Sequence, residues 1–137
     1  MKDTKAVKSE ALVNATMPIS MKDTKNVGRW IKKDKLNTAI TKLEKVLTKE
    51  IAMPVVVHRS GIGPRKGIGP GKYPLKVSKF IVKMLKELKA NARVKGLDET
   101  KLVINEFIPN MAISKEHRGK YQTGQLTHLK IGVVVEK

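Results

Sequence analysis

An amphipathic stretch at residues 75–95 constrains the fold more than any other part of this sequence. Its apolar residues recur three and four positions apart, which is the spacing of one face of an α-helix. This face consists of Val77, Phe80, Ile81, Met84, Leu85 and Leu88. Pro74 suits the first turn of such a helix, and Gly96 suits the position just beyond its C-terminal cap. A helix with one apolar face has to pack on another layer, so the stretch predicts a layered domain.

Two more helices are predicted on the N-terminal side of this stretch. Ser20 and Asp23 form an S-x-x-D capping signal, so a helix is expected over residues 21–32. A second helix is expected at about residues 35–50, because apolar residues again recur there at helical spacing. Asp34 is of a residue type that caps helix N-termini and is expected to cap this one.

The remaining apolar segments predict three strands, at about residues 11–18, 101–113 and 122–136. The last segment alternates Leu129, Ile131, Val133 and Val135 with Lys130, Gly132, Val134 and Glu136, as expected of a strand with one core face. Residues 109–128 are interpreted as an extended β-hairpin. We therefore predict an α+β fold, with three helices packed on a small three-stranded antiparallel sheet that carries an extended β-hairpin.

A single domain over residues 1–137 is expected, because a chain of this length suits one core. Residues 1–10 are polar and predict a flexible tail. Residues 54–73 form a basic Gly/Pro-rich insertion, in which GIGPRK is followed directly by GIGPGK. This composition argues against a helix or a central strand. We expect the repeat to become ordered only on RNA, because fixing each residue costs about 1–2 kcal/mol of backbone entropy.

The charge of the chain points to a polyanionic partner. It carries a formal net charge of +17, from 29 Lys+Arg and 12 Asp+Glu. In the first and the third predicted helix, four basic residues fall within an arc of about 80° opposite the apolar face. They are Lys22, Lys25, Arg29 and Lys32 in the first helix, and Lys76, Lys79, Lys83 and Lys86 in the third. Such like-charge neighbours destabilise an isolated helix, and a polyanion would turn that repulsion into attraction. Solvated lysine faces are the alternative.

Two further segments supply candidate RNA-binding residues. The insertion contributes Arg59, Arg65, Lys66, Lys72 and Tyr73, within a stretch from Ile51 to Lys86 that contains no acidic residue. The hairpin contributes Lys115, His117, Arg118, Lys120 and Tyr121. A flexible linker and an ordinary surface loop are the alternative interpretations. Because aromatic residues make up only 4% of the chain, contacts are expected mainly with phosphates and RNA shape rather than with stacked bases.

The sequence argues against an enzyme and against a membrane protein. It contains no cysteine, and His58, His117 and His128 lack the spacing of metal ligands. No catalytic residue, metal or cofactor is therefore expected. No apolar run reaches the ~18 residues of a membrane span, and MKDTKAVKSE at the start lacks the apolar core of a signal peptide. A cytoplasmic location without a membrane span is expected.

Several segments together resemble one family of ribosomal proteins. The most specific is residues 69–104, which is similar to a family segment with Gly-Arg-Tyr/Trp-Pro-x-Lys, a helix ending in Asn-Ala, and Lys-Gly-Leu-Asp before a strand. The matching residues here are Gly71, Lys72, Tyr73, Pro74, Lys76, Asn91, Ala92, Lys95, Gly96, Leu97 and Asp98. Ser20 and Lys22 match the family's Val-Ser-Pro-Arg/Lys-Lys pattern, although Met21 replaces its proline. The chain thus resembles the universal large-subunit protein numbered twenty-two in bacteria and seventeen in the eukaryotic cytosol.

The resemblance implies a function as well as a fold. It implies a structural constituent of the large ribosomal subunit that binds ribosomal RNA beside neighbouring ribosomal proteins. It also implies a hairpin that reaches the exit tunnel and could meet the nascent peptide. The insertion resembles the archaeal and eukaryotic branch. Family hairpins are usually Arg-rich, whereas Arg118 is the one arginine here and the arm before Gly119 is shorter, so a milder constriction is expected. The alternative is a free basic nucleic-acid-binding protein, such as an RNA chaperone or a chromatin factor.

Overall fold

The computed structural model describes residues 10–113 and 124–136. Strands β1 (Ala11–Met17), β5 (Leu102–Met111) and β6 (Thr127–Val135) form an antiparallel sheet with β6 in the centre. On one side, β6 pairs with β1 from Val133↔Ala11 to Thr127↔Met17. On its other side it pairs with β5, whose register shifts between Ile104 and Glu106. The three-stranded sheet and the β5–β6 hairpin confirm the prediction from the sequence.

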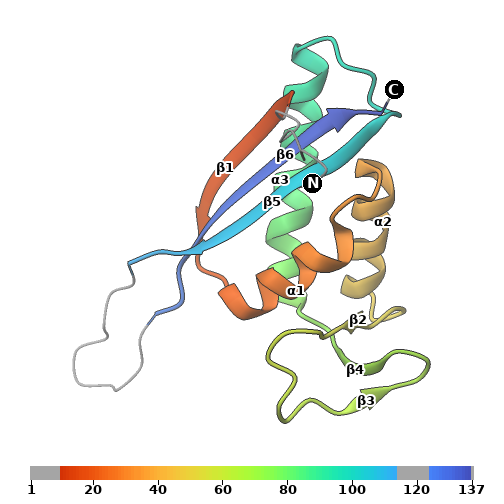
Figure 1. Ribbon diagram of the computed structural model, residues 1–137, viewed down its shortest axis with the longest axis vertical. Helices are drawn as coiled ribbons and strands as arrows, with labels where there is room; N and C mark the ends of the chain where they lie inside the picture. Colours follow the sequence, from red (N-terminus) through yellow and green to blue (C-terminus); the bar gives the residue numbers. More distant parts are fainter. Residues whose placement is uncertain (1–9, 114–123, 137) are drawn as a thin grey trace, which may run out of the picture.

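Three helices pack with this sheet: α1 (Met21–Ile31), α2 (Leu36–Leu47) and α3 (Leu75–Val94). Helix α3 contacts β1 and α2, and α1 crosses β5, so one face of the sheet is covered (Figure 1). The core lies in this layer. The predicted apolar face of α3 is part of it, because Val77, Ile81, Met84 and Leu88 are all buried. The α+β fold class is therefore confirmed.

The close approach of α1 to β5 depends on a glycine in the middle of the helix. Gly28 faces the ring of Phe107, and a Cβ atom at position 28 would come within 2.6 Å of Phe107 Cε1. No side chain larger than hydrogen fits at this separation. The glycine therefore sets how closely α1 packs on the sheet, and with it the position of the basic face on the opposite side of the helix.

The helix ends follow the local capping chemistry. Ser20 Oγ accepts from the Asp23 backbone N–H at 3.5 Å, as the capping signal predicted. Helix α3 ends in a Schellman motif, in which Gly96 has φ of +71° and the Leu97 N–H donates to Ala92 O at 3.0 Å. The cap predicted at Gly96 is confirmed.

Two details of the prediction for the second helix were wrong, its N-cap residue and its C-terminal end. Lys35 rather than Asp34 occupies the N-cap position, and the helix ends at Leu47 rather than near residue 50. The reason is that Asp34 has other partners. Its carboxylate pairs with Lys42 Nζ at 2.7 Å, and its backbone C=O accepts from the Ile104 N–H at 3.0 Å. Residue 34 is therefore held to the edge of β5 and is not free to cap α2.

The insertion forms a small second sheet, which corrects the expectation that its composition excludes a central strand. Strand β4 (Gly69–Lys72) lies between β2 (Met53–Pro54) and β3 (Pro64–Arg65). Proline has no backbone N–H, but Pro70 is tolerated in β4 because it pairs with the neighbouring segment through its carbonyl, which accepts from the Val55 N–H at 2.9 Å. In Figure 1 this second sheet lies below α1 and α2, at the end of the molecule where α3 begins.

Candidate nucleic-acid interface

Helix α1 carries a basic face that no acidic residue of the described part of the chain neutralises. Lys22, Arg29 and Lys32 are exposed, and Lys25 is half-buried. Within residues 10–113 and 124–136, none of the four forms an ion pair, although other lysines of the protein do. The α1 face therefore presents unpaired positive charge to the surroundings, as a phosphate-binding surface requires.

The predicted basic face of α3 divides into two parts. Lys76, Lys79 and Lys83 are exposed and have no acidic partner in the described part of the chain. Lys86 is also exposed, but its Nζ lies 3.1 Å from Glu44 Oε1 of α2. The first three lysines therefore offer their full charge to a partner, whereas Lys86 has a competing one.

The insertion is held against α1 by one buried side chain. Asn26 Oδ1 accepts from the backbone N–H groups of Val56 at 3.0 Å and Val57 at 2.9 Å. Its Nδ2 donates to Val57 O at 3.0 Å and to Lys22 O at 3.1 Å. With a relative exposure of 3%, this amide replaces water for four backbone groups. It therefore fixes where the insertion begins relative to the basic face of α1.

The predicted insertion residues differ in how free they are. Lys72 Nζ lies 3.0 Å from Asp23 Oδ1, so this lysine ties the end of the insertion to α1. The guanidinium of Arg65 lies over the Tyr73 ring, 5.3 Å from its centroid, as a cation–π pair. Arg59 and Lys66 are exposed and have no ion pair among the described residues. The structure thus assigns Lys72 a structural contact and leaves Arg59 and Lys66 available.

Gly71 makes the Arg65–Tyr73 contact possible. A Cβ atom at this glycine would lie 2.6 Å from Arg65 Cγ and 2.9 Å from Ile68 Cδ1. The stem of Arg65 therefore crosses directly over the backbone of β4 before it reaches Tyr73. Its guanidinium keeps its charge in this stacked position and presents it at the surface of the insertion.

Comparison with known proteins identifies the family. Residues 12–129 match the sequence profile of the family described as ribosomal protein L22p/L17e. This chain belongs to the L22p/L17e family. The match covers nearly all described elements, from β1 to the first residues of β6. The chain is therefore a large-subunit ribosomal protein of this family, which is a class of structural protein.

Similar proteins come from archaea, in agreement with the resemblance of the insertion to the archaeal and eukaryotic branch. The chain is 32% identical to large ribosomal subunit protein uL22 of Picrophilus torridus over 102 residues, 74% of this chain and 68% of that protein. It is 37% identical to uL22 of Archaeoglobus fulgidus over 105 residues, 74% of this chain and 66% of that protein. For uL22 of Halobacterium salinarum, identity is 32% over 127 residues, 88% of this chain and 81% of that protein.

Five predicted site residues of this L22p/L17e member lie outside the described residues. They are Lys115, His117, Arg118, Lys120 and Tyr121. The hairpin stem is described up to the pair Met111↔Thr127, which is also the level at which β1 ends. The role of the five residues therefore stays a prediction from sequence and family.

A group of polar residues on the uncovered face of the main sheet was not predicted. Asn14 and Thr16 of β1, His128 and Lys130 of β6, and Asn110 of β5 lie side by side across the three strands. Thr16 Oγ1 and His128 Nδ1 are 2.6 Å apart, and the group lines a shallow hollow of about 250 Å³. The strand alternation in β6 already placed His128 and Lys130 on one face. The sequence does not reveal the strand order, which places Asn14, Thr16 and Asn110 beside these two residues.

The described residues contain little that suggests catalysis. Within them, no group of three or more His, Asp or Glu residues could hold a metal ion, and no helix is long and apolar enough to cross a membrane. The side-chain hydrogen bond from Arg93 lowers the pKa of Glu99 below its usual value, with a further hydrogen bond from Lys89 acting in the same direction. This pair joins the end of α3 to the following turn, away from the basic faces, and its role is structural.

Proposed function

We propose that this protein is a structural constituent of the large ribosomal subunit and binds ribosomal RNA through the unpaired basic faces of α1 and α3 and through the insertion. Neighbouring subunit proteins are its further partners. The observation that carries the proposal is the contrast among the basic residues. Lys35, Lys42, Lys72, Lys86, Lys89, Lys130 and Arg93 are paired with acids, whereas the α1 face and Lys76, Lys79 and Lys83 of α3 have no acidic partner in the described part of the chain. Family membership supports RNA as the polyanion.

Phosphate contacts of this kind have a measurable salt dependence. If six or more phosphates are engaged, the slope of log K against log salt should be about −4 or steeper for single-stranded or structured RNA. Titration of the full chain with a large-subunit RNA transcript at increasing salt measures this slope. A slope near zero would remove the electrostatic basis of the proposal.

The insertion is proposed to complete its ordering on RNA. Its backbone is held at Val56 and Val57 by Asn26, and the GIGPRK/GIGPGK repeat extends beyond this anchor. Backbone amides of the repeat, with Arg65 and Lys66, would meet phosphates there. Amide exchange at Gly61, Lys66 and Gly67, which lie outside strands β3 and β4, should be fast in the free protein and slow in the subunit. Strong protection of these amides in the free protein would contradict the idea.

The segment 109–128 is proposed to reach the nascent-peptide exit tunnel. Support comes from the family and from the β5–β6 stem, which ends at Met111↔Thr127. With Arg118 as the main RNA anchor, we expect a milder constriction than an Arg-rich hairpin would make, because lysine grips phosphate less rigidly. Crosslinking from a photoreactive group at Lys120 tests this. Contacts with nascent peptide or tunnel-wall RNA support it, and contacts only with solvent-side RNA or neighbouring proteins would refute it.

A free RNA chaperone or chromatin factor would share the charge of this chain but not its place in the subunit. The two functions differ in where the protein is found. A subunit protein co-migrates with large subunits at moderate salt, and a free factor does not.

A further inference from the structure

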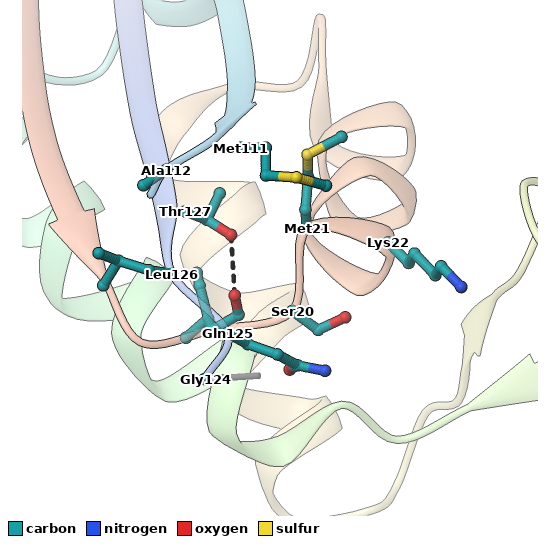
Figure 2. A pocket seen from close by; sticks show the side chains of 10 residues that line it. Ser20, Met21, Lys22, Met111, Ala112, Gly124, Gln125, Leu126 and Thr127 are labelled. Carbon is teal, nitrogen blue, oxygen red and sulfur yellow. Dashed lines mark hydrogen bonds between the residues drawn. The ribbon is translucent and has the colours of Figure 1, made fainter. Parts of the chain in front are cut away.

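A pocket of about 410 Å³ opens at the base of the hairpin, where three segments meet. It is lined by the turn that leads into α1, by the end of β5 and by the residues that lead into β6 (Figure 2). Its volume lies within the range typical of sites for small organic groups. The pocket adjoins the basic face of α1, and Lys22 belongs to both.

The apolar part of this pocket consists largely of two methionines. Met111 from the end of β5 and Met21 from the first turn of α1 both line the pocket, and their side chains overlap in the view of Figure 2. Met111 is 75% exposed, so its thioether is accessible to a partner. Thioether side chains are flexible and polarisable, and they make favourable contacts with the edges and faces of aromatic rings. The pair is therefore suited to a flat aromatic ligand.

The polar part of the pocket combines a fixed wall with free side-chain groups. The buried Thr127 hydroxyl donates to Ile19 O at 2.8 Å, which locks the β1–α1 turn to the start of β6. Gln125 is exposed, and among the described residues its amide has no hydrogen-bond partner. Lys22 has no acidic partner there either, and in Figure 2 its side chain extends away from the methionines. Next to the two methionines, the Gln125 amide and the Lys22 ammonium group are thus available to bind a ligand.

We propose that this pocket binds one unstacked nucleobase of ribosomal RNA. The base would lie against Met21 and Met111, its hydrogen-bonding edge would meet the Gln125 amide, and Lys22 would contact the adjoining phosphate. RNA bases outside a helix are commonly recognised by such a combination of a flat contact and an edge contact. The inference rests on the proposed RNA-binding function and adds a base contact to it. In a chain with few aromatic residues, two thioethers would provide the flat contact.

One wall of the pocket departs from the family pattern that the chain resembles. Met21 stands where that pattern has proline, and a proline ring would remove the flexible thioether at this position. The base contact is therefore a feature of this sequence. A protein with the same fold and the same basic faces but with proline at this position would retain the phosphate contacts and lose the methionine pair.

The direct test uses a diazirine amino acid at position 21, 111 or 113 of the full chain, incorporated into large subunits and irradiated. Ile113 is the matched control, because it is 96% exposed, is close to Met111 and does not line the pocket. Positions 21 and 111 should crosslink to the base of the same nucleotide, and position 113 should not. Crosslinks from 21 and 111 to protein, or to unrelated nucleotides, would overturn the proposal. Absence of the chain from the subunits would instead refute the proposed function itself.

Substitution provides a second readout that depends on affinity. Met21→Ser with Met111→Ser should weaken binding to the large-subunit transcript by about 2- to 12-fold per thioether contact, the equivalent of a sulfur–aromatic interaction. Ile113→Ser should leave affinity unchanged. The slope against salt should be the same in the methionine variant and the wild type, because no charge is removed. Unchanged affinity in the double variant, with an unchanged thermal unfolding profile, would overturn the proposal.

Discussion

The side-chain amide of Asn26 makes a pair of hydrogen bonds with the backbone of Val57, in the way that the backbone of a neighbouring strand would. The amide oxygen of Asn26 accepts from the Val57 N–H at 2.9 Å, and its NH₂ group donates to the Val57 carbonyl at 3.0 Å. This side chain therefore anchors the basic insertion to α1, in addition to the Lys72–Asp23 ion pair. These hydrogen bonds link the basic face of α1 to the insertion, which are two parts of the candidate interface.

The first prediction concerns this amide. Asn26→Ala should destabilise the protein by about 1–3 kcal/mol, because it leaves buried backbone groups without partners. Urea unfolding measures the loss, and faster amide exchange at Val56 and Val57 should accompany it. Asn37→Ala is the matched control, since Asn37 is an exposed helical asparagine, and should change stability by less than about 0.5 kcal/mol. Equal effects of the two substitutions would contradict the assigned role.

The second prediction concerns the packing of α1 on the sheet. Gly28→Ala should cost about 1–3 kcal/mol, because the added methyl group overlaps the Phe107 ring. Gly63→Ala should be nearly neutral by comparison, since a Cβ there meets open space. Phe107→Leu should reduce the penalty of Gly28→Ala, and a double-mutant cycle measures this coupling. Additive effects would show that the two residues do not contact each other.

The third prediction concerns the core face of α3. Met84→Ala or Leu88→Ala should each cost about 2–5 kcal/mol, because both side chains are buried and their removal leaves a cavity. Denaturant unfolding of the isolated domain measures it. A change below about 0.5 kcal/mol would show that this face is not part of the core.

The fourth prediction separates paired from unpaired lysines. Lys79→Ala with Lys83→Ala should flatten the slope of log K against log salt by about 1.4, if each lysine contacts one phosphate. Lys72→Ala with Lys86→Ala should flatten it less, because Asp23 and Glu44 already occupy these two ammonium groups. Circular dichroism should show an unchanged fold in the first pair. Equal slopes for both pairs would contradict the distinction.

Much of this fold could be predicted from local patterns. The core face of α3, the Ser20 cap and the turn at Gly96 follow from apolar spacing and from single residues with specific backbone preferences. The predictions failed where a segment far away in the sequence supplies the hydrogen-bonding partner. Asp34 was expected to cap α2, but β5, some seventy residues later, holds it in place. The Gly/Pro repeat was expected to avoid a central strand, but β2 supplies a hydrogen-bonding partner for β4.

The candidate site was predictable in its charge but not in its pairing. The helical wheel identified the lysines of α1 and α3 correctly as surface faces. It could not show that Lys72 pairs with Asp23, because the two residues are 49 positions apart in the chain. The pocket formed by Met21 and Met111 was also invisible, because its walls come from an α1 turn and a strand end that only the folded topology brings together.

The most direct test of the central claim is sedimentation of ribosomal subunits from cells that express the tagged full chain. At moderate salt, the account predicts that the protein co-migrates with large subunits, is absent from small subunits, and is released when the RNA is digested. The variant with Lys79→Ala and Lys83→Ala should dissociate at lower salt than the wild type. Recovery of the wild-type protein only at the top of the gradient, or bound to DNA, would contradict the account.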